Sequence, residues 1–209
     1  MTKYHNYKKG DNYMPNWCST NIQIYHYDED RLEQLYNDIV KWKNISMSNN
    51  GFDSPNNKCW LGNVVLNSGI DTEGLSYRGS IDDIEYDGNQ IRISTETAWS
   101  PMVQMWKRIV QRYLPAAEIT FSAEEPGNGI YCTNDEKCKD RYIIDCWGRN
   151  DVESEWEATE GMVVNILQHC LKTDITDVNE LLEMFEDDDN LTDDMAIHKW
   201  DIVSIDEVD

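Results

Sequence analysis

Carboxylate side chains gather in one short stretch near the C-terminal end of the sequence, and they are the clearest candidates for a binding role. Carboxylates that repeat along a rigid element can substitute for phosphates opposite arginine and lysine side chains. The stretch is therefore predicted to contact a basic partner protein. The predicted contact residues are Glu180, Glu183, Glu186, Asp187, Asp188, Asp189, Asp193 and Asp194.

The same acidic stretch has two metal-based alternatives. A calcium loop needs ligands at ordered positions around a central glycine, and the run from Asp187 to Asp194 has neither. A metal-dependent nuclease needs carboxylates that converge inside a cleft, whereas a continuous acidic run is typical of a solvated face. We therefore expect no bound metal ion and no other cofactor.

Cysteine chemistry is a further alternative, because the sequence contains six cysteines. A zinc site could be imagined from Cys132, Cys138 and Cys146 with His169. The gaps between these cysteines are five and seven residues, whereas structural zinc sites typically have two-residue gaps within a cysteine pair. We therefore expect reduced thiols that act as small buried hydrophobes. The sequence places no histidine beside Cys18, but it does not show which side chains the fold brings near, so a nucleophilic role for this thiol stays open.

Glu96 lies close in sequence to Trp99, so an acid beside a hydrophobic wall is a third possibility. Such a wall raises the pKa of a carboxyl group by withholding water from its charged form. The favoured interpretation is structural, because a tryptophan at the end of a strand commonly closes a core.

A strand followed by a helix, residues 90–114, is the unit around which the chain is organised. Ile91, Ile93 and Thr95 alternate with polar residues, which indicates a half-buried strand. Ser100 is predicted to cap the following helix, with Pro101 at its first position. Apolar residues from 102 to 113 recur at spacings of three and four, and Pro115 ends the helix.

The neighbouring segments complete a recognisable order. Asp28 is predicted to cap a helix that ends near Lys43, and about 44–77 reads as an insertion. Strands are expected at 18–26, 80–86 and 118–123, and Asp87-Gly88 signals a hairpin. The order β-α-(insert)-β-β-α-β predicts an α+β, ferredoxin-like sandwich, with two helices on one face of an antiparallel sheet.

The remainder of the chain is expected to contain short strands followed by helices. Thr159, Thr176 and Thr192 are the predicted helix caps, and the third helix would reach about Trp200. The predicted strands are 130–133, 142–147, 156–159 and a terminal strand at 202–208. We divide the chain into a flexible leader (1–13), a ferredoxin-like domain (14–150) and an acidic C-terminal extension (151–209).

The net charge of the 209-residue chain is −22, and the charge is unevenly distributed. Residues 1–150 contain 16 basic and 21 acidic residues, whereas residues 151–209 contain 2 and 19. Such a field repels nucleic acid and attracts basic protein surfaces. The sequence has no run of 18 apolar residues and no export signal, so we expect a cytoplasmic protein that does not enter membranes.

The exposed face of the predicted sheet is the natural place for single-stranded RNA, which stacks on aromatic side chains of such sheets. The first strand places Asn21, Gln23 and Tyr25 on this face, and the organising strand adds Arg92, Ser94 and Glu96. Only Tyr25 is aromatic, so RNA recognition is disfavoured. We expect a polar face that is solvated or covered by the acidic extension.

Three segments resemble the YubB-type ferredoxin-like domain family of phage and plasmid proteins. They are Met-Pro-Asn-Trp-Cys at 14–18, Ser-Thr-Glu-Thr-Ala-Trp-Ser-Pro at 94–101 and Glu-Glu-Pro-Gly at 124–127. The resemblance covers about 14–150 and implies a ferredoxin-like fold and an origin in a mobile element. It implies no activity and no catalytic residues.

Charge and resemblance together lead to one expected function. We expect a non-enzymatic protein that occupies the basic, nucleic-acid-binding surface of a host protein. The concrete version is a nucleic-acid mimic that inhibits a defence nuclease such as a CRISPR effector. Two alternatives remain, namely an enzyme acting on nucleic acid or nucleotides and a structural accessory protein with a solubilising acidic tail.

Overall fold

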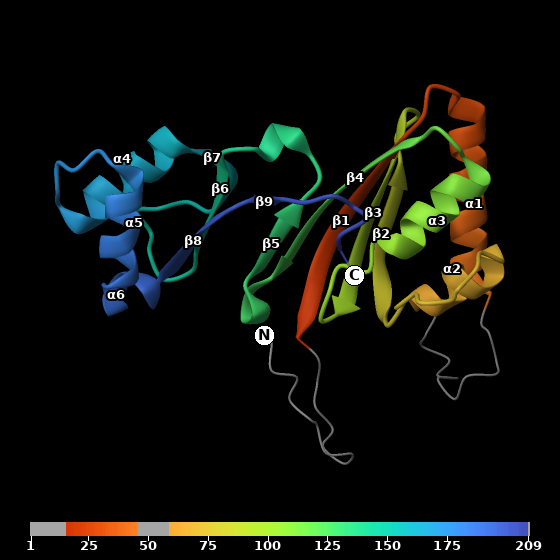
Figure 1. Ribbon diagram of the computed structural model, residues 1–209, viewed down its shortest axis with the longest axis horizontal. Helices are drawn as coiled ribbons and strands as arrows, with labels where there is room; N and C mark the ends of the chain where they lie inside the picture. The colour runs from red at the N-terminus through yellow and green to blue at the C-terminus, as the bar shows by residue number, and fades with distance from the viewer. Residues whose placement is uncertain (1–15, 46–58, 209) are drawn as a thin grey trace, which may run out of the picture.

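The computed structural model describes residues 16–45 and 59–208 (Figure 1). The leader predicted at 1–13 and part of the predicted insertion lie outside these ranges. The described residues form a mixed α+β structure with one six-stranded sheet and one three-stranded sheet. The chain enters the large sheet first, builds the small sheet next and returns to the large sheet at its end.

The large sheet has the strand order β2-β3-β1-β4-β5-β9. Neighbouring strands are antiparallel except β5 and β9, which are parallel. The alternation seen in the sequence sets which side of each strand is buried, because successive side chains point to opposite faces. The strands are β1 (Trp17–Tyr25), β2 (Gly79–Tyr86), β3 (Gln90–Ala98), β4 (Glu118–Glu125), β5 (Ile130–Thr133) and β9 (Asp201–Ile202).

Helices cover one face of the large sheet and leave the other face free of helices (Figure 1). Trp106 belongs to one of these helices and is fully buried in the core between the helices and the sheet. The helices and the sheet share one core: Ile93, Phe121 and Leu32 are buried in it, and Tyr36 and Ile119 pack against it half-buried. The covering helices are α1 (Glu29–Asn44), α2 (Leu61–Ser68) and α3 (Gln104–Tyr113).

The ends of these helices test the predicted caps. Asp28 caps α1, because its carboxylate accepts the backbone N–H of Arg31 at 3.1 Å. The prediction that Ser100 caps the next helix is wrong, because α3 begins at Gln104. Met102 has a φ of 51°, which is a left-handed conformation that a continuous right-handed helix excludes. The helix ends at Tyr113, just before Pro115, as predicted.

The second body contains the three-stranded sheet, in the order β7-β6-β8. A second core, with Leu167, Leu181 and Phe185 among its buried residues, joins this sheet to three helices. Because β6 lies before residue 150 and β8 after it, a division of the chain at that residue cuts through the sheet. The elements are β6 (Arg141–Cys146), β7 (Glu155–Thr159), β8 (Met195–Lys199), α4 (Glu160–Leu171), α5 (Val178–Glu186) and α6 (Asp189–Thr192).

The predicted C-terminal helices are correct only in part. Thr159 caps α4 as expected, but α5 is capped by Asp177 rather than Thr176. The helix predicted from Thr192 is wrong. Asp188 caps the single turn of α6, and the chain then forms β8, which pairs with β6. Met195 and Ile197 alternate with more exposed residues, a period-2 pattern that pairing with β6 uses.

The last described segment returns to the main sheet, as the blue trace in Figure 1 shows. The terminal strand predicted at 202–208 is wrong in extent, because β9 contains only Asp201 and Ile202. Beyond β9, Val203 and Ile205 pack against the core between the large sheet and its helices, which we call the main core. The Gln104 side chain donates a hydrogen bond to the carbonyl of Ile205, and Lys107 forms an ion pair with Asp206.

Candidate functional site

The predicted partner-binding carboxylates lie at the end of the second body, on α5, α6 and the loops around them. Six of the eight are exposed, whereas Asp188 and Asp194 are half-buried. Glu180, Glu183 and Asp187 are spaced by three and four residues, which places them on one face of a helix. The exposed set is Glu180, Glu183, Glu186, Asp187, Asp189 and Asp193.

The two half-buried acids take part in the local structure. The Asp188 carboxylate accepts the backbone N–H groups of Asn190 at 3.0 Å and Leu191 at 3.3 Å. The backbone carbonyl of Asp194 accepts the N–H groups of Trp147 and Gly148, each at 3.0 Å. Asp188 therefore begins α6, and the backbone at position 194 ties α6 to the loop after β6.

The carboxylates of α5 and α6 are not neutralised by ion pairs within the part of the chain that the structure describes. The last turn of α5 contains no basic residue, and Glu186 and Asp187 lie where the helix dipole is negative. Acids at that end destabilise a helix by roughly 0.3–1 kcal/mol each. This arrangement opposes helix stability, so its rationale has to be sought outside folding.

A shallow hollow of about 600 Å³ adjoins the acidic run. Leu171 and Met184 supply its apolar part, and Asp187, Asp188 and Asp189 supply its acidic part. Met184 is 37% exposed, which leaves its flexible thioether free to adapt to a partner. The surface therefore combines negative charge with an apolar contact area.

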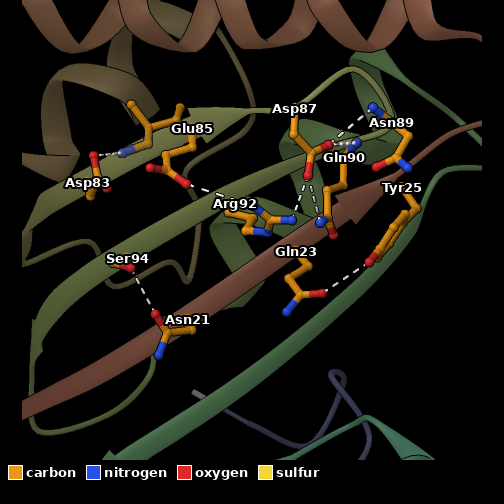
Figure 2. A network of polar contacts seen from close by, with 11 residues as sticks. Asn21, Gln23, Tyr25, Asp83, Glu85, Asp87, Asn89, Gln90, Arg92 and Ser94 are labelled. Atoms are coloured by element: carbon orange, nitrogen blue, oxygen red, sulfur yellow. Dashed lines mark hydrogen bonds and ion pairs between the residues drawn. The ribbon is translucent and has the colours of Figure 1, made fainter.

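The face of the large sheet that the helices leave free carries a network of polar side chains (Figure 2). The Ser94 hydroxyl donates to Asn21 Oδ1 at 2.8 Å, and the Tyr25 hydroxyl donates to Gln23 Oε1 at 3.3 Å. The prediction that these residues share the free face is confirmed by the β1–β3 register.

Arg92 is the cation of this network, and two acids compensate it. Its guanidinium group lies 2.5 Å from Asp87 Oδ2 and 3.8 Å from Glu85 Oε2. The pKa of Asp87 is held below its usual value, first by the hydrogen bond from the Gln90 side chain and also by Arg92. The cation is thus engaged within the sheet, which disfavours this face as a contact for phosphate groups.

A groove of about 330 Å³ lies between this free face and the second body. Polar side chains of β1 and β4 form its floor, and Trp156 and Glu157 of β7 line it as well. All charged residues of this described lining are acids, namely Glu124, Asp135 and Glu157. The floor residues are Asn21, Gln23, Thr120, Ser122 and Glu124.

Two tryptophans and one carboxylate define the geometry of the groove. The indole N–H of Trp200 donates to the backbone carbonyl of Trp156 at 2.8 Å. Burial raises the pKa of Glu124 and Asp145 adds to the rise, whereas a hydrogen bond with the Trp156 side chain opposes it. Sequence reasoning missed these three residues, because they come from segments far apart in the chain.

The described parts of the three segments that carry the family resemblance lie close together at one end of the large sheet. The backbone N–H of Trp99 donates to the carbonyl of Asn16 at 3.0 Å, and the Thr97 hydroxyl donates to the carbonyl of Ser100 at 2.6 Å. Glu125 is 2% exposed, and its Oε1 accepts the N–H of Gly127 at 2.9 Å. Its Oε2 has no hydrogen-bond partner among the described residues.

The remaining residues considered for chemistry are dispersed or buried. Burial raises the pKa of the Cys18 thiol to about 11, which disfavours the nucleophilic thiolate. Burial also raises the pKa of Glu96, with Asp82 as the next contribution. In residues 16–45 and 59–208, no three histidine, cysteine or acidic side chains are grouped to hold a metal ion.

Two further findings concern membrane-spanning helices and similarity to known proteins. Among the helices of the described ranges, none has both the length and the apolar character needed to span a bilayer. Comparison of the chain with protein-family models, with curated proteins and with solved structures finds no significant match.

Proposed function

We propose that this protein is a non-enzymatic binding protein whose acidic surface on α5 and α6 occupies a basic surface of a partner. The observation that carries the proposal is the exposed, uncompensated set of carboxylates at the end of α5. Because these charges oppose the helix dipole, they destabilise the helix and are not explained by folding. Opposite arginine and lysine side chains they would form charge-assisted hydrogen bonds.

The spacing of these carboxylates supports mimicry of nucleic acid. Residues three or four apart on a helix rise by about 4.5–6 Å, whereas phosphates of one DNA strand repeat about every 3.4 Å along the axis. The two spacings are of the same order, so the same basic groove of a partner could contact either the carboxylates or the phosphates. The concrete partner is a host nuclease or nucleic-acid-binding complex, such as a CRISPR effector.

The large sheet supports the ferredoxin-like part of the proposal. Its first four strands are ordered β2-β3-β1-β4, with α1 and α3 on one face. This is the arrangement that a βαββαβ sandwich requires. We therefore propose a ferredoxin-like core, and the resemblance of its three motifs to phage and plasmid proteins supports an origin in a mobile element.

The proposal is tested by reversing charges on α5 and α6 and measuring inhibition of DNA cleavage by a purified CRISPR effector. The variant Glu183→Lys, Asp187→Lys, Asp189→Lys leaves the α6 cap at Asp188 intact. The wild type should slow cleavage, and its association rate should fall with added salt because ions screen the attraction. The variant should associate at least about tenfold more slowly.

A charge-matched variant separates the local surface from the overall charge. Three exposed glutamates belong to the part of the chain that forms the large sheet and its helices, namely Glu33, Glu73 and Glu118. Changing all three to lysine alters the net charge by the same amount as the α5–α6 variant does. This control should inhibit nearly as well as the wild type. Equal losses in both variants, inhibition that salt leaves unchanged, or direct binding of this protein to DNA would each refute the proposal.

A further inference from the structure

We propose that the groove between the free face of the large sheet and β7 binds the guanidinium group of an arginine side chain carried by a peptide or protein. The groove lies between the two bodies and does not include any residue of α5 or α6. The inference therefore stands independently of the acidic surface discussed above.

The charges of the groove select a cation. Glu124, Asp135 and Glu157 are the charged residues of its lining, and the lining contains neither lysine nor arginine. Glu124 rises from the floor and is only half-exposed. A partly desolvated carboxylate attracts a cation more strongly than a solvated one, because the local dielectric constant is lower.

The shape and the neutral groups of the groove favour guanidinium over ammonium. Guanidinium is planar, presents five N–H donors and stacks on aromatic rings. Trp156 offers an indole ring that is 46% exposed, and Asn21 and Gln23 add carbonyl oxygens, each with two lone pairs. The volume of about 330 Å³ is at the small end of ligand pockets, which suits one side chain.

The same lining favours an arginine within a chain over the free amino acid. Free arginine carries an α-ammonium and an α-carboxylate, two strongly hydrated charges that would lie at the mouth of a groove of this size, and their partial desolvation costs free energy. In a peptide both α-charges are replaced by amides, so that the guanidinium is the only charge left. The expected partner segment is thus an exposed arginine on a protein surface or in an extended peptide.

The experiment titrates the full chain with N-acetyl-L-arginine methylamide and follows the indole N–H signals by NMR. Trp156→Phe assigns the Trp156 signal, which should shift on titration. Glu124→Gln should weaken binding roughly five- to tenfold, since the hydrogen-bond acceptor loses its negative charge. Trp156→Ala should weaken it roughly two- to fivefold. Free arginine should bind more weakly than the capped probe.

Matched controls decide whether the groove is responsible. Glu183→Gln removes the same charge from α5, and Trp147→Ala removes an indole that is 59% exposed outside the groove; both should bind like the wild type. The capped citrulline analogue, neutral but similar in shape, should not bind. Equal binding of citrulline, a loss in Glu183→Gln as large as in Glu124→Gln, or shifts confined to the indole signal of Trp147, which donates to the Asp193 carbonyl, would overturn the inference.

Discussion

At the scale of single residues, the cysteines differ in ways that only the fold reveals. Cys18 and Cys132 face the main core, and burial raises the pKa of their thiols to about 11 and about 12. Cys59 is exposed. The sequence predicted buried thiols in general, but it gave no means of separating Cys59 from the others, because burial depends on which strands become neighbours.

This difference predicts the order of thiol modification. In native protein at pH 8, iodoacetamide should modify Cys59 first and leave Cys18 and Cys132 unmodified, because the reactive thiolate is scarce and inaccessible at both buried sites. Peptide mass mapping measures the modification. After denaturation all three should react. Early modification of Cys18 in the native protein would contradict the packing of β1 and would revive its nucleophilic role.

At the scale of elements, local patterns predicted those strands and helices whose stabilising contacts lie nearby in sequence. The alternation in β3, the cap at Asp28 and the stop at Pro115 are of this kind. The segment at 192–200 was predicted wrongly as a helix. Its strand β8 depends on pairing with β6, a partner more than 40 residues away that no local window contains.

The turn after α3 leads to a prediction about stability. Ala116 is exposed and has a φ of 75°, a left-handed conformation that costs a residue with a β-carbon roughly 1–2 kcal/mol. Glycine avoids that cost but loses about 0.5–1 kcal/mol of backbone entropy. Ala116→Gly should therefore raise the free energy of unfolding by about 0.5–1 kcal/mol, measured by urea denaturation.

The neighbouring alanine is the control for this change. Ala117 is not one of the described residues with a positive φ, so its backbone is not left-handed. Its side chain packs half-buried against the main core. Ala117→Gly should lower the free energy of unfolding. If both substitutions destabilise the protein to the same degree, the left-handed turn at Ala116 is refuted.

At the scale of the whole molecule, charge was a poor guide to organisation. The change in composition near residue 150 predicted a boundary there, but β6 precedes that residue and shares a sheet with β7 and β8. Charge reports which surfaces meet solvent, whereas sheets are assembled by pairing between distant segments. The acidic surface could be predicted from composition. The groove could not, because its lining comes from both the large sheet and β7 of the second body.

The return of the chain to the large sheet gives the last prediction. Residues 201–208 place β9 beside β5, and Val203, Ile205 and Val208 pack half-buried against the main core. Removing 201–209 should therefore lower the free energy of unfolding by about 2–4 kcal/mol, from the apolar surface returned to water. In a Cys59→Ser background the truncation should also open Cys132 to iodoacetamide, because Cys132 lies on β5, the strand that β9 borders.

Asp206→Asn is the control for this truncation. It removes only an ion pair whose acid is 67% exposed, so it should change the free energy of unfolding by less than about 1 kcal/mol. An unchanged free energy of unfolding in the truncated chain would mean that residues 201–208 do not stabilise the large sheet. The edge strand of that sheet would then be β5.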